Sequence, residues 1–110
     1  MKRILADRAI VITGAGRGLG AAYALHAGRL GAKLVINDVN AGAAQATADA
    51  IVAAGGEAMV SAGSVSDWDY AASLIATCVS AYGRIDGLVN NAAILRHGKI
   101  TEMTEQDLRA

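Results

Sequence analysis

The chain has 110 residues, which suits one small domain with a single modest core. Its ten basic and ten acidic residues cancel, so charge favours neither a nucleic acid nor an acidic membrane surface as the partner. There is one cysteine, no apolar run near the roughly 20 residues that cross a bilayer, and no signal-peptide pattern, so we expect a cytoplasmic protein.

Four short segments rich in β-branched residues are apolar on both faces, which is typical of buried parallel strands. They span residues 9–13, 33–37, 58–61 and 85–90. Helical patterns over residues 18–30, 41–54 and 66–83 separate them.

Two details of these helices are specific predictions. In the first helix, Leu19, Tyr23 and His26 are spaced to form one face, which we expect to pack on the sheet. In the third helix, the capping-box spacing from Ser66 to Asp69 predicts a start at Ser66, and Leu74 and Cys78 belong to its apolar face.

The alternation of strand and helix predicts an α/β fold, a Rossmann-type doubly wound parallel sheet with strand order 3-2-1-4. A fourth helix pattern begins near Thr104, and the sequence stops at Ala110. We therefore expect an incomplete sheet whose fourth strand has a bare outer edge, so that the chain is marginal alone or is completed by another chain.

Glycines occupy every second position of "GAGRGLG", residues 14–20, between the first strand and the first helix. Backbone N–H groups at a helix N-terminus attract anions, and glycine lets phosphate oxygens approach the backbone closely. The stretch also fits the G-x-G-x-x-G/A dinucleotide pattern from Gly16 onward. It therefore predicts a diphosphate site; the alternative is a tight turn that binds nothing.

Asp38 ends the second strand, about 20 residues after the loop, where a dinucleotide site needs a carboxylate for the adenosine ribose hydroxyls. Its charge disfavours a 2′-phosphate and so favours NAD over NADP. Arg17 in the loop is the opposing feature, because a guanidinium pairs with phosphate.

Two motifs together resemble the short-chain dehydrogenase/reductase family. "TGAGRGLG" at residues 13–20 matches its T-G-x-x-x-G-x-G loop, and "NNAA" at residues 90–93 is similar to its N-N-A-G motif. Within the family, "AYALHAGRLGAKLVINDV" most resembles members that use NAD, including the dehydrogenase part of peroxisomal multifunctional enzymes. The resemblance implies that residues 1–110 are the N-terminal part of one NAD(P)-binding Rossmann domain, truncated at the start of the fourth helix.

The resemblance also implies which residues contact the cofactor. The glycine-rich loop would hold the diphosphate, Asp38 the adenosine ribose, the turn after the third strand the adenine, and the residues after the fourth strand the ribose near the nicotinamide. Ser64 stands where the family usually has Asp, and Asn90 would brace the sheet. The full set is Gly14, Arg17, Gly18, Leu19, Gly20, Asp38, Ser64, Val65, Asn91 and Ala92.

The family transfers hydride between a nicotinamide and an alcohol or carbonyl carbon, with the tyrosine of a Y-x-x-x-K pair as general acid/base. None of Tyr23, Tyr70 and Tyr82 has a lysine four residues later. We therefore expect no catalytic residue and no metal site in this chain, and expect it to be inactive by itself.

Three functions stay open at this point. The first is the cofactor-binding portion of an NAD-dependent oxidoreductase that is a homo-oligomer at full length. The second is a non-catalytic nucleotide-binding or dimer-modulating protein. The third, a methyltransferase using S-adenosylmethionine, is disfavoured by "NNAA" and by the three-residue gap after Gly14.

Overall fold

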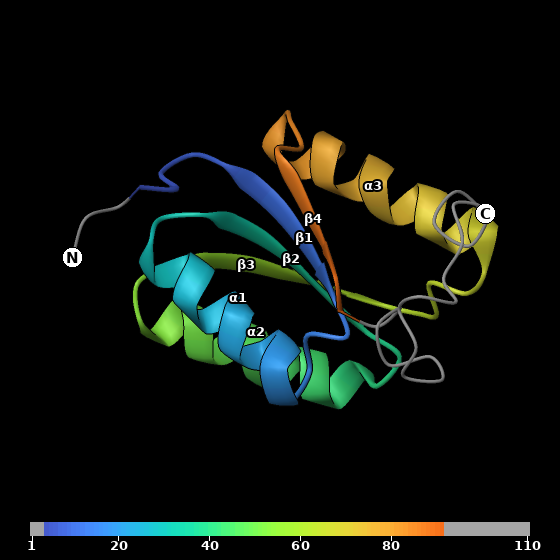
Figure 1. Ribbon diagram of the computed structural model, residues 1–110, viewed down its shortest axis with the longest axis horizontal. Helices are drawn as coiled ribbons and strands as arrows, with labels where there is room; N and C mark the ends of the chain where they lie inside the picture. Colours follow the sequence, from blue (N-terminus) through green and yellow to red (C-terminus); the bar gives the residue numbers. More distant parts are fainter. Residues whose placement is uncertain (1–3, 92–110) are drawn as a thin grey trace, which may run out of the picture.

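The computed structural model describes residues 4–91, in which strands and helices alternate along the chain (Figure 1). The elements are β1 (Ala9–Thr13), α1 (Gly18–Arg29), β2 (Lys33–Asp38), α2 (Ala41–Ala53), β3 (Glu57–Ala62), α3 (Trp68–Tyr82) and β4 (Gly87–Asn90). Every strand and helix expected within this range is present. The expected fourth helix lies outside the described residues.

All four strands are parallel and lie in the order β3-β2-β1-β4, which confirms the predicted topology. Val11 of β1 is in register with Val35 of β2 and with Leu88 of β4. Because the strands are parallel, their carboxyl ends meet at one edge of the sheet, and the loops that follow them gather there.

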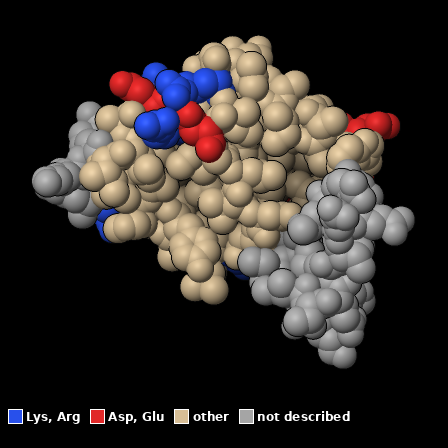
Figure 2. All heavy atoms as spheres, turned by 45° about the horizontal axis from the view of Figure 1, so that its top comes forward, with Lys and Arg blue, Asp and Glu red and all other residues tan. Residues whose placement is uncertain are grey.

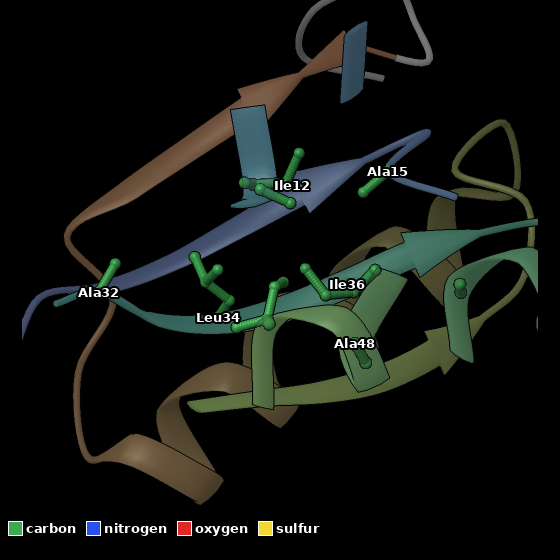
Figure 3. Packing of buried hydrophobic residues seen from close by; sticks show 9 residues of the cluster. Ile12, Ala15, Ala32, Leu34, Ile36 and Ala48 are labelled. Carbon is green, nitrogen blue, oxygen red and sulfur yellow. The ribbon is translucent and has the colours of Figure 1, made fainter. Parts of the chain in front are cut away.

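Helices α1 and α2 cover one face of the sheet and α3 covers the other (Figure 1). Alternate residues of a strand point to opposite faces, so Ile12, Leu34 and Ile36 pack under α1 and α2. Figure 3 shows Ile12, Leu34 and Ile36 on neighbouring strands of the sheet, with Ala48 of α2 near Ile36. Val11 and Val35 face α3, where Leu74 and Cys78 are buried as expected.

The predicted packing face of α1 is wrong. Leu19 is 66% exposed and Tyr23 is 48% exposed, whereas the buried positions are Gly20, Ala24 and Gly28. These small residues let the helix lie close to its neighbours, since a Cβ at Gly28 would stand 2.9 Å from Cγ2 of Ile51. An apolar pattern read from large side chains misses a helix that packs through glycine and alanine.

The expected start of α3 is also wrong, by one residue. Asp67 is the N-cap, and its carboxylate accepts a hydrogen bond from Tyr70 N at 3.1 Å. Ser66 is instead bonded through its hydroxyl to Ser64, at 2.6 Å between the oxygens. Both Ser and Asp are good caps, and the turn geometry selects Asp67. The helix ends as expected at Gly83, which has φ 77°.

Asp86 ties the start of β4 to the start of β1. It accepts a hydrogen bond from Ala9 N at 2.8 Å and two from the Arg84 guanidinium at 2.7 Å. Hydrogen bonding to Arg84 and then to Ala9 lowers the pKa of Asp86 to about 2.

Figure 2 shows acidic and basic side chains gathered on one part of the visible surface. In residues 4–91 no helix is long and apolar enough to span a bilayer.

Candidate functional site

Loops from three strands meet at the carboxyl edge of the sheet and are joined there by hydrogen bonds. Asp38 is the connecting residue: its carboxylate accepts from Gly16 N of the β1–α1 loop, and its carbonyl accepts from Gly63 N of the β3–α3 turn. Asn91, after β4, donates to Gly14 O at 3.2 Å. Asp38, Asn91 and the glycine-rich loop are therefore brought together at this edge.

The N-terminus of α1 is suited to an anion. Arg17 is its N-cap but makes no side-chain capping bond, and no acidic residue lies in the first turn. The two other helices are capped by Asn40 and Asp67. Within residues 4–91, the first-turn N–H groups of α1 and the positive end of its dipole thus meet no side-chain carboxylate, which favours binding of a diphosphate.

Two glycines shape this loop in different ways. Gly18 has φ 60°, and a Cβ there would meet nothing within 4 Å, so the backbone faces open space that a phosphate can enter. Gly20 is buried, and a Cβ there would overlap Gly14 O and stand 2.9 Å from Nδ2 of Asn91. Gly20 therefore permits close packing, whereas Gly18 permits close approach from outside.

Asp38 is held at the end of β2 by both carboxylate oxygens. Oδ2 accepts from Gly16 N at 2.9 Å and Oδ1 accepts from Asn40 N at 3.0 Å. The residue is only 9% exposed. Each carboxylate oxygen has further acceptor capacity, so a fixed carboxylate of this kind fits the two hydroxyls of a ribose.

Gly16 was not among the predicted cofactor contacts, yet it shapes the carboxylate site. A Cβ at Gly16 would stand 2.8 Å from Oδ2 of Asp38 and 2.7 Å from Cβ of Ala43. Only glycine fits there without a shift. The second glycine of "TGAG" was a visible signal for this role, although it falls on a free position of the family loop pattern.

The predicted adenine residues have different surroundings. Ser64 is exposed, and its hydroxyl is engaged with that of Ser66. Val65 is half-buried and packs against the apolar cluster under α3. Arg17 is exposed, as is Leu19, at the mouth of the loop.

Asn90 and Asn91 both anchor β4. The Thr13 hydroxyl donates to Oδ1 of Asn90 at 3.2 Å, which confirms that Asn90 braces the sheet. Asn91 is 6% exposed and holds the glycine-rich loop through Gly14 O, a contact that the sequence did not predict. Ala92 lies outside the described residues.

A buried polar cluster beside Asp38 was also missed. Nδ2 of Asn37 donates to the Tyr70 hydroxyl at 3.0 Å and to the carbonyls of Ser61 and Gly63 at 3.1 Å. The hydroxyls of Ser61 and Tyr70 are 2.6 Å apart. The available signal was Asn37 itself, a polar residue that directly follows the three apolar residues at the centre of β2.

Two ionisable groups near the core are unsuited to catalysis. Burial, with Glu57 and Cys78, raises the pKa of Tyr82 to about 12, and its hydroxyl is bonded to Leu34 O at 2.8 Å. Burial and Asp86 raise the pKa of the Cys78 thiol. Residues 4–91 hold no group of three His, Cys, Asp or Glu placed to bind a metal ion.

Comparison with known proteins identifies the family of the chain. The model of the family described as short chain dehydrogenase matches residues 8–110. Peroxisomal multifunctional enzyme type 2 of Drosophila melanogaster is 46% identical over 109 residues, which cover 91% of this chain and 18% of that protein.

Solved structures give the same result. A short chain dehydrogenase from Mycobacterium avium is 42% identical with a TM-score of 0.80, over 97% of this chain and 40% of that one. A metagenomic short-chain oxidoreductase in complex with NADP is 42% identical with a TM-score of 0.76, over 79% of this chain and 39% of that one. The chain thus spans 40% or less of the length of each of these three proteins. With its family match, its parallel sheet and its glycine-rich loop, the chain belongs to the short-chain dehydrogenase/reductase family.

Proposed function

We propose that this chain is the N-terminal cofactor-binding portion of an NAD-dependent oxidoreductase. The observation that carries the proposal is the fixed Asp38 carboxylate beside an α1 N-terminus that lacks a side-chain cap. When bound, the nicotinamide would exchange a hydride with an alcohol or carbonyl carbon of the substrate.

The order of the strands supports an order of binding groups. The β1–α1 loop would hold the diphosphate, Asp38 at the end of β2 the ribose, and the turn after β3 the adenine. Since β1, β2 and β3 are adjacent in the sheet, these three positions follow one another along its carboxyl edge. Gly14, Arg17, Gly18, Leu19 and Gly20 serve the first position in this proposal, Ser64 and Val65 the third, and Asn91 and Ala92 the nicotinamide side.

Asp38 also favours NAD over NADP. Both of its oxygens are fixed, so the carboxylate cannot easily turn away from a 2′-phosphate, and the two anions would repel each other. Arg17 is the opposing feature, and one structural neighbour holds NADP. In this chain the carboxylate occupies the ribose position directly, whereas Arg17 is an exposed side chain of the loop.

The test is a calorimetric titration of the purified protein with NAD and with NADP. We expect tighter binding of NAD, and Asp38→Asn should reduce the preference about tenfold, since hydrogen bonds to charged groups contribute about 1.5–3 kcal/mol. Asp49→Asn is the matched control, because Asp49 is exposed on α2 and bonds only to Gln45 in the described residues. Tighter binding of NADP by the unmodified protein would refute the preference.

The alternative is a nucleotide-binding or dimer-modulating protein without catalysis. It is distinguished by reading the coding sequence past Ala110 for a Y-x-x-x-K pair, whereas an assay of the purified 110-residue chain with a panel of alcohols and ketones tests for turnover, which neither function predicts. We expect no turnover by this chain and expect the pair downstream; a stop codon directly after Ala110 would favour the alternative. A cytoplasmic location and a homo-oligomeric full-length protein remain part of the proposal.

A further inference from the structure

Tyr70 links three segments beneath the turn that follows β3. It lies in the first turn of α3, and its hydroxyl is 2.6 Å from the hydroxyl of Ser61 in β3. The same oxygen accepts a hydrogen bond from Nδ2 of Asn37 in β2 at 3.0 Å. Asn37 is 1% exposed and Tyr70 is half-buried, so the hydrogen bonds of this cluster are partly shielded from water and are stronger than exposed ones.

The ring of Tyr70 and the amide of Asn37 hold Gly63 between them. A Cβ at Gly63 would stand 2.5 Å from Cε1 of Tyr70, so the ring fills the space that a side chain at this position would need. Gly63 O accepts from Nδ2 of Asn37 at 3.1 Å, and Gly63 N donates to Asp38 O at 3.1 Å. The turn is therefore fixed to β2 on one side and to α3 on the other.

We propose that Tyr70 is a positioning residue for the adenosine end of the dinucleotide. It would act by holding the turn at residues 63–65 beside Asp38, so that this wall of the adenine position is formed before the ligand arrives. The inference rests on the proposed function, and it adds a residue that touches no part of the ligand. When the turn is already ordered in the free protein, binding does not have to order it. The entropy cost of binding is then smaller and the affinity for the ligand is higher.

Tyr70→Phe tests this with little disturbance of packing, because it keeps the ring against Gly63 and removes only the hydroxyl. Ser61 loses its hydroxyl partner, while Asn37 keeps the carbonyls of Ser61 and Gly63. We expect the affinity for AMP to fall about three- to tenfold, the range that one hydrogen bond gives. Affinity for nicotinamide mononucleotide should not change.

Tyr82→Phe is the matched control. It makes the same substitution on the same helix and also removes a hydroxyl bond to β2, here to Leu34 O at 2.8 Å. Leu34 lies near the start of β2, away from the carboxyl edge. Tyr82→Phe should therefore lower the unfolding temperature and leave the affinity for AMP unchanged.

Calorimetry with AMP and with nicotinamide mononucleotide is combined with amide hydrogen exchange of the unliganded protein. Faster exchange at residues 63–65 in Tyr70→Phe but not in Tyr82→Phe, together with the selective loss of AMP affinity, is the expected result. Gly63→Ala, which must displace the ring, should act in the same direction.

Two outcomes separate the inference from the proposed function. If the unmodified protein binds neither AMP nor nicotinamide mononucleotide, the proposed function is wrong, and the role proposed for Tyr70 is then wrong as well. If the unmodified protein binds AMP and Tyr70→Phe binds AMP equally well, only the role of Tyr70 is wrong. The same holds if both tyrosine variants lower the affinity for AMP to the same extent.

Discussion

Gly16 and Asp38 form a contact in which a missing side chain is as important as a charged one. The N–H of Gly16 donates to the carboxylate at 2.9 Å, and the absence of a Cβ leaves the room for that approach. A backbone donor aimed at a carboxylate orients it without introducing a countercharge. The contact thus orients Asp38 without placing a cationic side chain against it.

Gly16→Ala should therefore weaken the binding of NAD about tenfold and destabilise the protein by about 1–3 kcal/mol, the usual cost of overpacking. The added methyl group would contact Asp38 Oδ2 and Ala43 Cβ, so either the carboxylate or α2 must move. Calorimetry and urea denaturation measure the two effects. Gly42→Ala is the control, since a Cβ there would meet only Oδ1 of Asn40, at 3.4 Å. Unchanged affinity in Gly16→Ala would show that the contact does not orient Asp38.

At this scale the sequence predicted the positions of residues that end a strand, while their roles stay predictions. Asp38 ends its strand, and the register of parallel strands then puts it beside the loop after β1. The sequence did not predict the role of Tyr70, because the distance from its hydroxyl to Asn37 depends on how α3 docks on the sheet. Local patterns carry no information on that docking.

Among the elements, α1 shows most clearly how packing departs from hydrophobic pattern. Its fully buried positions are Gly20, Ala24 and Gly28, spaced four residues apart, whereas Leu19 and Tyr23 are exposed and Leu25 is only partly buried against the core. Strands were predicted to within two residues because a buried parallel strand is uniformly apolar and needs no choice of face. A helix buries only one face. Because the buried residues of α1 are small, the hydrophobic pattern did not show which face that is.

Gly28→Leu should destabilise the protein by about 1–3 kcal/mol, because even a Cβ there would stand 2.9 Å from Ile51. Ala22→Leu, at an exposed position of the same helix, should change stability by less than about 0.5 kcal/mol. Urea denaturation of the two variants compares them directly. Equal stabilities would mean that α1 does not pack closely through Gly28.

For the whole molecule, Asp86 joins β1 to β4, its neighbour in the sheet, at the edge opposite the proposed cofactor site. Its pKa of about 2 lies below the value of about 3.9 for an unfolded aspartate. A lowered pKa means that the stabilisation is complete above about pH 4 and is lost as the pH falls toward 2. Thermal melting between pH 2 and pH 5 should therefore show a fall in stability that Asp86→Asn reduces.

Asp86→Asn should also be less stable than the unmodified protein at pH 7, since it loses the ionic bonds to Arg84. Asp49→Asn serves again as control, because its partner Gln45 is uncharged. An unchanged acid dependence in Asp86→Asn would assign the acid sensitivity to other carboxylates.

The bond from Asn91 to Gly14 O gives the molecule a built-in order of assembly. Its partners are 77 residues apart in sequence, and Asn91 directly follows the last described strand. The glycine-rich loop is among the first segments of the chain to be synthesised, yet its carbonyl is held only after β4 has paired with β1. Contacts of such long range form only after the entropy of closing a long loop has been lost. Dinucleotide binding would then report that β4 has joined the sheet, so a nascent chain shorter than 91 residues is expected to leave the cofactor unbound.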